Sequence, residues 1–130
     1  MAERTCIPPL SPFEEQAGFT RALRTGNRIV VSGTIGVEAD GSVSHDAGAQ
    51  ADRCFALIAQ YVEQLGGQMA DVVRVRMFVT EIGDADAVTA AFTRALGQVR
   101  PTGTLVAVAA LYRSDWKVEI EAEAVVGDEP

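Results

Sequence analysis

The chain has 130 residues, a formal net charge of −7 at pH 7 and 48% hydrophobic residues. This length suggests one domain, residues 1–130, with enough apolar side chains for a core. The negative charge argues against nucleic acid as a partner, because phosphate binding depends on clustered lysine and arginine, and Lys117 is the only lysine.

The sequence does not indicate a membrane segment, a secretory route or a metal centre. The longest uncharged apolar run, residues 105–112, is far shorter than the ~20 residues that span a bilayer, and residues 1–11 lack the apolar core of a signal peptide. Cys6 and Cys54 form neither a metal-binding spacing nor a disulfide framework, and His45 is the only histidine. We therefore expect a cytoplasmic protein with no metal and no cofactor, with Cys54 in the core and His45 at the surface.

The first predicted element is a β-hairpin. Residues 1–16 are rich in proline and are expected to be irregular, with Cys6 among them. Residues 19–24 and 28–32 flank Thr25-Gly26-Asn27, a turn sequence that favours a hairpin.

A helix is predicted next. Either Asp46 or Ser44 can cap its start through a short side-chain oxygen, and the helix extends to about Leu65. Gly66-Gly67 ends it, because glycine tolerates the left-handed conformation found at helix ends. Its apolar residues recur at intervals of three and four and form one stripe: Ala47, Ala51, Cys54, Phe55, Ile58, Val62 and Leu65.

The remaining elements alternate between strand and helix. Residues 71–80 are predicted as a strand in which Val73, Val75, Met77 and Val79 alternate with Arg74, Arg76 and Phe78. Asp84 is predicted to cap a second helix, which Gly97 ends. Residues 105–111 are apolar throughout, which favours a strand buried on both sides. Residues 117–126 alternate strictly between apolar residues and glutamates, so the element order is ββαβαββ, an α+β fold.

Two helices can cover only one face of such a sheet. The other face would carry a mixed row: Val30, Ser32, Arg74, Arg76, Phe78, Glu119, Glu121 and Glu123. If the strands are neighbours, Arg74 and Arg76 can pair with the glutamates. The row is either an exposed amphipathic surface or an oligomer interface. We favour the interface, in a closed ring of identical subunits, because residues 105–111 also need covering.

Three segments carry a family resemblance: Val31-Ser32-Gly33-Thr34-Ile35-Gly36, Arg100-Pro101-Thr102-Gly103-Thr104-Leu105-Val106 and Val118-Glu119-Ile120-Glu121-Ala122-Glu123-Ala124. In their order and spacing, over residues 19–126, they resemble the Rid family of reactive imine/enamine deaminases, also called YjgF. The resemblance implies a chorismate-mutase-like (YjgF-like) α+β domain with two helices on one face of its sheet. It also implies a homotrimer with small-molecule clefts between adjacent subunits.

The resemblance also implies functional residues. The family's glutamate, which positions the attacking water, corresponds to Glu119, and its substrate-binding Ser-Gly motif corresponds to Ser32 and Gly33. Its tyrosine in the first strand is Phe19 here, which keeps the ring without the hydroxyl, and its cleft asparagine corresponds to Thr89. Structural roles are the alternatives: an ion pair with Arg74 or Arg76 for the glutamate, a strand end for the serine and a bulge or turn for the glycine.

The chain departs from the family at Gly103. In the deaminating members a Pro-Ala-Arg-Ser segment supplies an arginine at this position, which holds the substrate carboxylate. Loss of such a charge-assisted pair costs ~2–5 kcal/mol of binding, so simple 2-iminoacids should bind poorly unless another cation replaces it. The candidates, each of which can equally be a surface charge, are Arg24, Arg100 and Arg113.

Two further residues belong to the expected substrate site. Thr104 and the free backbone N–H groups around Gly103 offer hydrogen bonds to a differently placed polar group. Trp116 precedes the strand of Glu119, where it can cover the cleft, stack on a flat ligand or only pack its own loop.

Two functions remain open. The first is water addition to a C=N or enamine bond in a substrate other than a simple 2-iminoacid, with Glu119 orienting the water. The second is a trimeric small-molecule-binding protein without chemistry of its own, which Gly103 favours. Ribonuclease activity, sometimes attached to this family, fits poorly because the chain is acidic and has one histidine.

Overall fold

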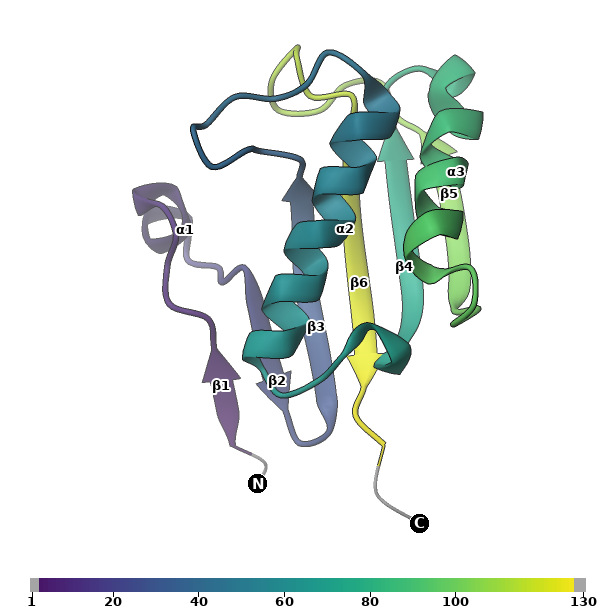
Figure 1. Cartoon of the computed structure of the whole chain (residues 1–130). Coiled ribbons are helices and arrows are strands. Elements are labelled where there is room, and N and C mark those ends of the chain that lie inside the picture. Colours follow the sequence, from purple (N-terminus) through teal and green to yellow (C-terminus); the bar gives the residue numbers. More distant parts are fainter. Residues whose placement is uncertain (1–2, 128–130) are drawn as a thin grey trace.

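One mixed sheet organises the chain (Figure 1). The computed structural model describes residues 3–127. The strands are β1 (Arg4–Cys6), β2 (Ala22–Thr25), β3 (Arg28–Ile35), β4 (Val72–Val79), β5 (Thr102–Ala107) and β6 (Val118–Val125). The α-helices are α1 (Pro12–Ala17), α2 (Ala47–Gln64) and α3 (Ala85–Leu96), with short 3-10 turns at Met69–Asp71 and Ile82–Asp84. The strand order is β1-β2-β3-β6-β4-β5, and only the β4–β5 pair is parallel.

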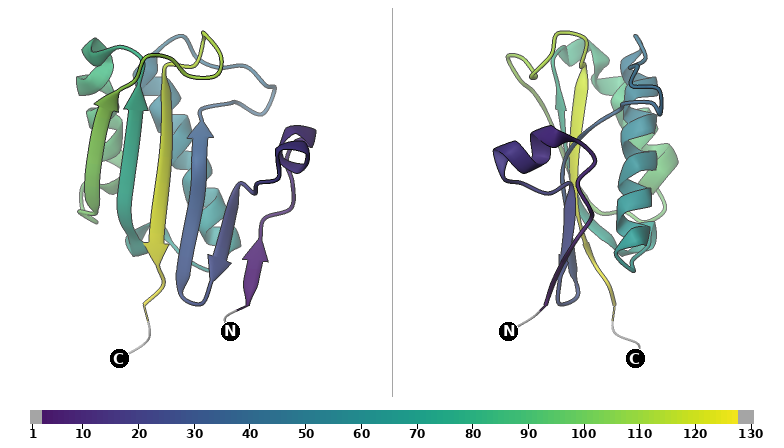
Figure 2. Two further views of the ribbon diagram at one scale, coloured as in Figure 1. Left: turned by 180° about the vertical axis from the view of Figure 1, so that it is seen from behind. Right: turned by 90° about the vertical axis from the view of Figure 1, so that its left-hand side faces the viewer.

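The long helices α2 and α3 cover one face of the sheet, as the sequence predicted. The edge-on view shows that α1 and the β5–β6 connection project on the opposite side (Figure 2). The sheet residues on the helix side are buried: Ile29, Val31, Val75, Met77, Val79, Val118, Ile120, Ala122 and Ala124. Each side chain of this kind stabilises the fold by about 1.5–3 kcal/mol when it is large and fully buried. The core therefore lies between the sheet and the two helices, and the other face is left open, which confirms the predicted α+β class.

Helix α2 follows its sequence signals closely. Asp46 is the N-cap, and its carboxylate accepts a hydrogen bond from the Ala49 N–H at 2.9 Å. Ser44 supports the cap by accepting from the Asp46 N–H at 3.1 Å. Gly66, with φ of +87°, stands just beyond the helix, where a residue with a side chain would be strained. The predicted cap, stripe and stop are all confirmed.

The prediction of an irregular segment over residues 1–16 is wrong for its described part. β1 pairs with β2 in the register Cys6↔Leu23, so Cys6 is an exposed strand residue. α1 begins with Pro12, directly after Ser11, where a fixed φ suits a first helical residue. The prolines suggested an irregular segment, but the pairing of β1 with β2 and the helical turn that starts at Pro12 give it regular structure.

Two strand predictions also need correction. A bulge between Val72 and Arg74 places Val72 in the core and leaves Val73 42% exposed, so the inward row begins one residue earlier than the alternation suggested. β5 lies at the sheet edge, and Val106 is 41% exposed. The expected burial on both sides of residues 105–111 is therefore wrong within one subunit.

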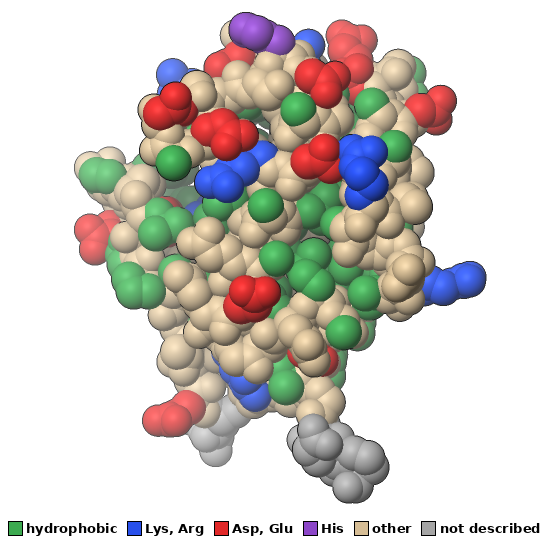
Figure 3. Space-filling model, in the orientation of Figure 1, with side chains coloured by type: hydrophobic (Ala, Val, Ile, Leu, Met, Phe, Trp, Pro, Cys, Tyr) green, Lys and Arg blue, Asp and Glu red, His purple; other side chains and the backbone are tan. Residues whose placement is uncertain are grey.

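Charged side chains are dispersed on the helix-covered surface (Figure 3). Lysine and arginine there alternate with acidic residues, as in the pair of Arg94 with Asp52 at 3.0 Å. His45 is exposed and Cys54 is buried, as predicted. Within residues 3–127, no helix combines the length and the apolar character needed to cross a membrane.

A buried glutamine fixes the start of β6. Gln50, which is 0% exposed, donates from Nε2 to the carbonyls of Ser44 at 2.7 Å and Asp115 at 3.0 Å. Its Oε1 accepts from the Lys117 N–H at 2.9 Å. Because the last two partners flank Trp116 in the chain, this side chain holds that aromatic residue and the entry to β6 against α2.

Gln50→Leu should lower the free energy of unfolding by about 2–3 kcal/mol, because the backbone groups at Ser44, Asp115 and Lys117 would lose their buried partner. Chemical denaturation measures this loss. Gln60→Leu, an exposed glutamine on the same helix, is the matched control and should change stability by less than about 0.5 kcal/mol. Equal effects of the two substitutions would contradict the role of Gln50.

Candidate functional site on the open sheet face

Three glutamates line the open face of β6, and two of them are neutralised. Glu121 pairs with Arg76 of β4 at 2.8 Å, and Glu123 pairs with Arg28 of β3 at 3.1 Å. The first contact confirms that β4 neighbours β6 and that Arg76 pairs with a glutamate across the strands, whereas Arg74 makes no ion pair within 4.0 Å among residues 3–127. Glu119 makes no ion pair within 4.0 Å among residues 3–127. It is the carboxylate of this face that is left available for chemistry.

A β-bulge makes room for Glu119. In the β3–β6 ladder Val31 faces Ala122 and Thr34 faces Ile120, so Ser32 and Gly33 together oppose one residue of β6. A Cβ built on Gly33 would overlap the Glu119 carboxylate. Glycine is therefore required for the observed position of that carboxylate. Gly33 was expected to be either a bulge or a substrate-binding residue. The two roles are compatible, because the bulge is what leaves room for the Glu119 carboxylate.

The surroundings of Glu119 make its charged form less favourable than that of an exposed glutamate. Burial raises the pKa of Glu119 above its ordinary 4.5, nearby Arg21 opposes this rise and the Glu121 carboxylate adds to it. Burial of Cys54 itself raises the pKa of its thiol to about 12, and the charge of Glu119 adds to this rise. Cys54 therefore remains a protonated core residue. A carboxyl group with a raised pKa is a stronger base than an ordinary carboxylate and is better suited to accept and return a proton.

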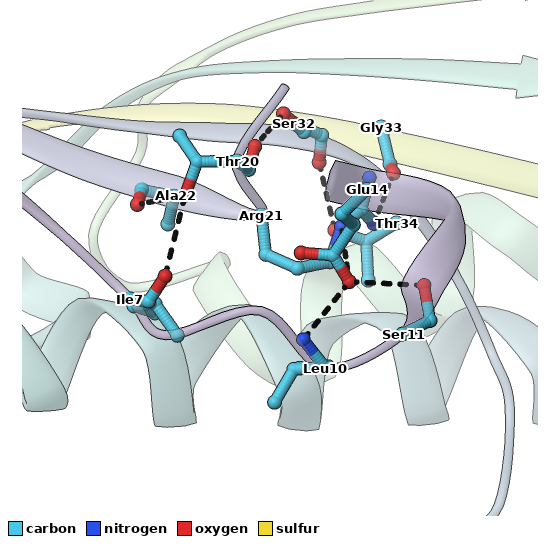
Figure 4. A network of polar contacts seen from close by, with 10 residues as sticks. All are labelled: Ile7, Leu10, Ser11, Glu14, Thr20, Arg21, Ala22, Ser32, Gly33 and Thr34. Carbon is cyan, nitrogen blue, oxygen red and sulfur yellow. Dashed lines mark hydrogen bonds and ion pairs between the residues drawn. The ribbon is translucent and has the colours of Figure 1, made fainter. Parts of the chain in front are cut away.

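Arg21 is a residue of this site that the sequence reasoning missed. Its guanidinium donates to the Gly33 carbonyl at 2.8 Å (Figure 4). It also lies 5.1 Å from the centre of the Phe19 ring. It also approaches Glu14 of α1 to 4.0 Å. Arg21 thus connects the bulge, the aromatic residue before β2 and the short helix.

Glu14 is itself buried, at 4% exposure. Its Oε2 accepts from the Leu10 N–H at 3.2 Å and from the Ser11 hydroxyl at 3.3 Å (Figure 4). Its Oε1 has no hydrogen-bond partner within residues 3–127. The positive charge of Arg21 therefore offsets the burial of this carboxylate and ties α1 to the site.

Ser32 and Phe19 lie close to Gly33 and Arg21. The Ser32 hydroxyl donates to the Thr20 carbonyl at 2.7 Å, so its oxygen lone pairs are what it can still offer to a ligand. Phe19 is 39% exposed beside the guanidinium of Arg21. Their roles in binding stay predictions.

Other predicted site residues lie apart from Glu119 within one subunit. Gly103 pairs with Val75 on the helix-covered side of β5, and a Cβ there would lie 3.6 Å from the Phe92 ring, an ordinary contact. Thr104 pairs with Arg76 of β4. Its own strand, β5, lies two strands away from β6. Thr89 is exposed on α3. These three can meet Glu119 only if another copy of the chain brings them there.

The cations considered as replacements for the family's arginine do not gather at Glu119. Arg24 donates to the Leu65 carbonyl at 2.9 Å and so secures the end of α2. Arg100 and Arg113 are exposed, the former with a positive φ of 58° before β5.

Sequence signals for the missed residues did exist. The hairpin register pairs Thr25 with Arg28, and the same register extended along both strands sets Arg21 opposite Ser32. Glu14 closes the pattern Ser11-Pro12-Phe13-Glu14, in which serine, proline and glutamate stand where a helix start favours them.

The chain is thus an α+β protein in which the Glu119 carboxylate lies against a β-bulge and makes no ion pair among the described residues. The sequence profile of the family described as Endoribonuclease L-PSP matches residues 11–126. A 2-iminobutanoate/2-iminopropanoate deaminase of Escherichia coli is 34% identical over 111 residues, covering 82% of this chain and 86% of that protein.

Two further likenesses agree. An uncharacterized protein of Streptomyces coelicolor is 32% identical over 90% of this chain and 88% of its own length. A crystal structure from Mycobacterium tuberculosis, a member of the YjgF/YER057c/UK114 family, superimposes with a TM-score of 0.87 at 36% identity, over 95% of this chain and 100% of that one. The chain belongs to the YjgF/Rid family.

Glu119→Gln should raise the melting temperature at pH 8. The raised pKa means that the folded state disfavours the charged carboxylate, so stability is intact below the ordinary pKa of 4.5 and falls as pH rises through the folded-state value. The gain from glutamine should therefore disappear below about pH 4.5. Thermal unfolding across this pH range measures it.

The matched control is Glu123→Gln, on the same face of β6. This carboxylate is paired with Arg28 at 3.1 Å, and its replacement should give no gain at pH 8. A stability difference for Glu119→Gln that is the same at pH 4 and pH 8 would contradict the interpretation.

Proposed function

We propose that this protein is an imine or enamine hydrolase acting on a substrate other than a simple 2-iminoacid, in clefts between the subunits of a homotrimer. The observation that supports it best is Glu119: a half-buried carboxylate without an ion pair among the described residues, held at Gly33, with a raised pKa. Glu121 and Glu123 on the same strand are paired with arginines instead.

The proposed reaction balances with water alone. The Glu119 carboxylate accepts a proton from water as the water oxygen bonds to the imine carbon. Glu119 returns this proton to the nitrogen, then accepts the hydroxyl proton of the carbinolamine and passes it to the nitrogen as the C–N bond breaks, so that a carbonyl compound and ammonia leave. General acid–base assistance of this kind contributes about 10²–10⁴-fold in rate. Ser32 and the backbone at the bulge would hold the ligand against this carboxylate.

The substrate class follows from what replaces the family's arginine. The deaminase relatives are named for 2-iminoacids, which carry a carboxylate, whereas Gly103 offers none of the bidentate contacts that bind one. Ribonuclease activity is disfavoured, in spite of the family description, because the chain has a net charge of −7 and one histidine.

A non-catalytic binding protein is the second candidate. Gly103 favours it, since removal of a substrate anchor is the change expected when a site keeps its shape and loses its reaction. The two candidates differ in one measurable respect, the rate at which imines disappear.

The oligomer is part of the proposal. The hollow on the open face has a volume of only about 70 Å³ and is lined by Val30, Val31, Arg74, Arg76, Glu121, Ala122 and Glu123. It has room for a few water molecules but not for a substrate. Val106 and Ala107 of β5 present exposed apolar side chains at the sheet edge. A neighbouring copy would cover that edge and complete the cleft.

Light scattering should give a trimer of the 13.8 kDa chain at micromolar concentration. Val106→Glu should shift the population to smaller species, because it would bury a charge at the covered edge. Ile82→Glu, at an exposed apolar residue outside the sheet, serves as its control. A monomeric wild type would overturn the trimer and the shared cleft.

Catalysis can be tested with imines generated in situ, 2-iminoacids by an L-amino-acid oxidase and imines without a carboxylate by an amine oxidase. The wild type should hydrolyse the imines without a carboxylate and act weakly on 2-iminoacids. Glu119→Gln should lower kcat/KM by about 10²–10⁴-fold. Gly33→Ala should fold but lose activity, since its Cβ would displace the flexible Glu119 side chain.

Matched controls separate chemistry from folding. Glu123→Gln removes a carboxylate from the same face, and Gly83→Ala adds a methyl group where nothing lies within 4 Å; both should keep wild-type rates. Turnover that survives Glu119→Gln would refute the role of that residue. A wild type inert toward every imine, yet stabilised by small carbonyl compounds, would support the binding protein instead.

A further inference from the structure

Four aromatic rings form a continuous row on the side of the open face. Phe19 contacts Phe13 of α1, edge to face, with ring centres 5.8 Å apart. Phe13 contacts Tyr112 at 6.0 Å, and Tyr112 contacts Trp116 at 6.4 Å with the rings tilted by only 32°. The row thus joins α1 to the β5–β6 connection, the two segments that project away from α2 and α3 (Figure 2).

Three rings of the row, Phe13, Phe19 and Tyr112, are exposed and Trp116 is partly buried, although most rings of this size are buried in folded proteins. Phe13 is 53% exposed and Tyr112 is 82% exposed. Exposed apolar side chains that occur singly need no explanation, but a contiguous group marks a binding surface.

Both ends of the row are fixed by buried polar groups. At one end, α1 is held by Glu14, whose carboxylate is 4% exposed and approached by Arg21. At the other end, Gln50 binds the backbone on both sides of Trp116. The rings are therefore positioned before any ligand arrives, which lowers the entropic cost of binding.

Both ends of the row are connected to the segments around Glu119. Phe19 lies under Arg21, whose guanidinium binds the Gly33 carbonyl at the bulge that seats Glu119. Trp116 stands three positions before Glu119 in the chain. The row is therefore connected to the segments that hold the Glu119 carboxylate, through Arg21 and the bulge at one end and through the start of β6 at the other.

The charges beside the row favour a cation. Glu119 is not ion-paired among the described residues, and the faces of aromatic rings attract positive charge. Arg21, the positive group nearby, is engaged with the Gly33 carbonyl and Glu14. A carboxylate ligand would find no free cation here, whereas an iminium ion would find both a counter-charge and rings.

We propose that the row of Phe13, Phe19, Tyr112 and Trp116 selects a substrate with an aromatic ring next to a protonated imine and no carboxylate. This inference rests on the proposed function, because it names the substrate class of the Glu119 site. The reaction is R₂C=NH₂⁺ + H₂O → R₂C=O + NH₄⁺, in which the C–O bond forms, the C–N bond breaks and no oxidant is needed.

The first test compares imines made in situ by an amine oxidase from 2-phenylethylamine and from 2-cyclohexylethylamine. The phenyl imine should be preferred in kcat/KM by about tenfold, the factor that one to two aromatic contacts provide. Phe13→Leu and Tyr112→Leu should each reduce this preference mainly through KM. Phe92→Leu, whose ring packs with Phe55 on the helix side, should keep it. No phenyl preference, or a preference that survives both row variants, overturns the inference while hydrolysis of both imines keeps the proposed function.

The second test measures binding without chemistry. The 2-phenylethylammonium ion is a stable, cationic mimic of the iminium substrate, and Trp116, the only tryptophan of the chain, reports binding by its fluorescence. Saturable quenching that Phe13→Leu weakens, and that 2-cyclohexylethylammonium reproduces only at higher concentration, supports the row even if no imine is hydrolysed. Trp116 emission that responds to protein concentration and not to the ammonium ion would show that a second copy covers the row, which overturns the inference.

Discussion

The site depends on one irregularity in the pairing of β3 with β6. Two residues of β3, Ser32 and Gly33, occupy the space opposite one residue of β6. At the bulge the Gly33 carbonyl accepts a hydrogen bond from Arg21. The bulge also brings a residue without a side chain against the Glu119 carboxylate. It therefore positions this carboxylate and the neighbouring positive charge together.

The open face separates its charges by function. Arginines of the two strands beside β6 neutralise Glu121 and Glu123, and such partly exposed pairs contribute at most about 1 kcal/mol each. These pairs help to fix the register of the strands, and they neutralise two of the three carboxylates on this face. Glu119, left without such a partner in the described chain, carries the cost of burial as a raised pKa. A residue that is unfavourable for stability and retained at a structured bulge is what an active site requires.

Much of the fold could be predicted from periodicity and capping. The hairpin, the cap at Asp46, the stripe of α2 and the alternation of β6 depend on neighbours in sequence, which is where such rules are strong. The errors arose where tertiary contacts decide. A bulge places Val72 instead of Val73 in the core, and Arg4–Cys6 form a strand by pairing with β2. At the site, family resemblance indicated Glu119 and Gly33, but Arg21 and Glu14 were missed because their importance comes from a hydrogen bond and an ion pair across segments.

Gly103 acquires a different meaning beside the aromatic row. A Cβ at that position meets only the Phe92 ring at an ordinary distance, so packing within the subunit does not require glycine. The subunit would accept a Cβ at this position, and the chain has none. At the same time the row supplies ring surface that is exposed and held from both ends. A site that gives up a bidentate cation must gain its binding free energy elsewhere, and aromatic contacts next to a carboxylate are the source this face offers. Retention of Glu119 with loss of the arginine is therefore consistent with a change of substrate charge, from an anion held at its carboxylate to a cation held at its ring.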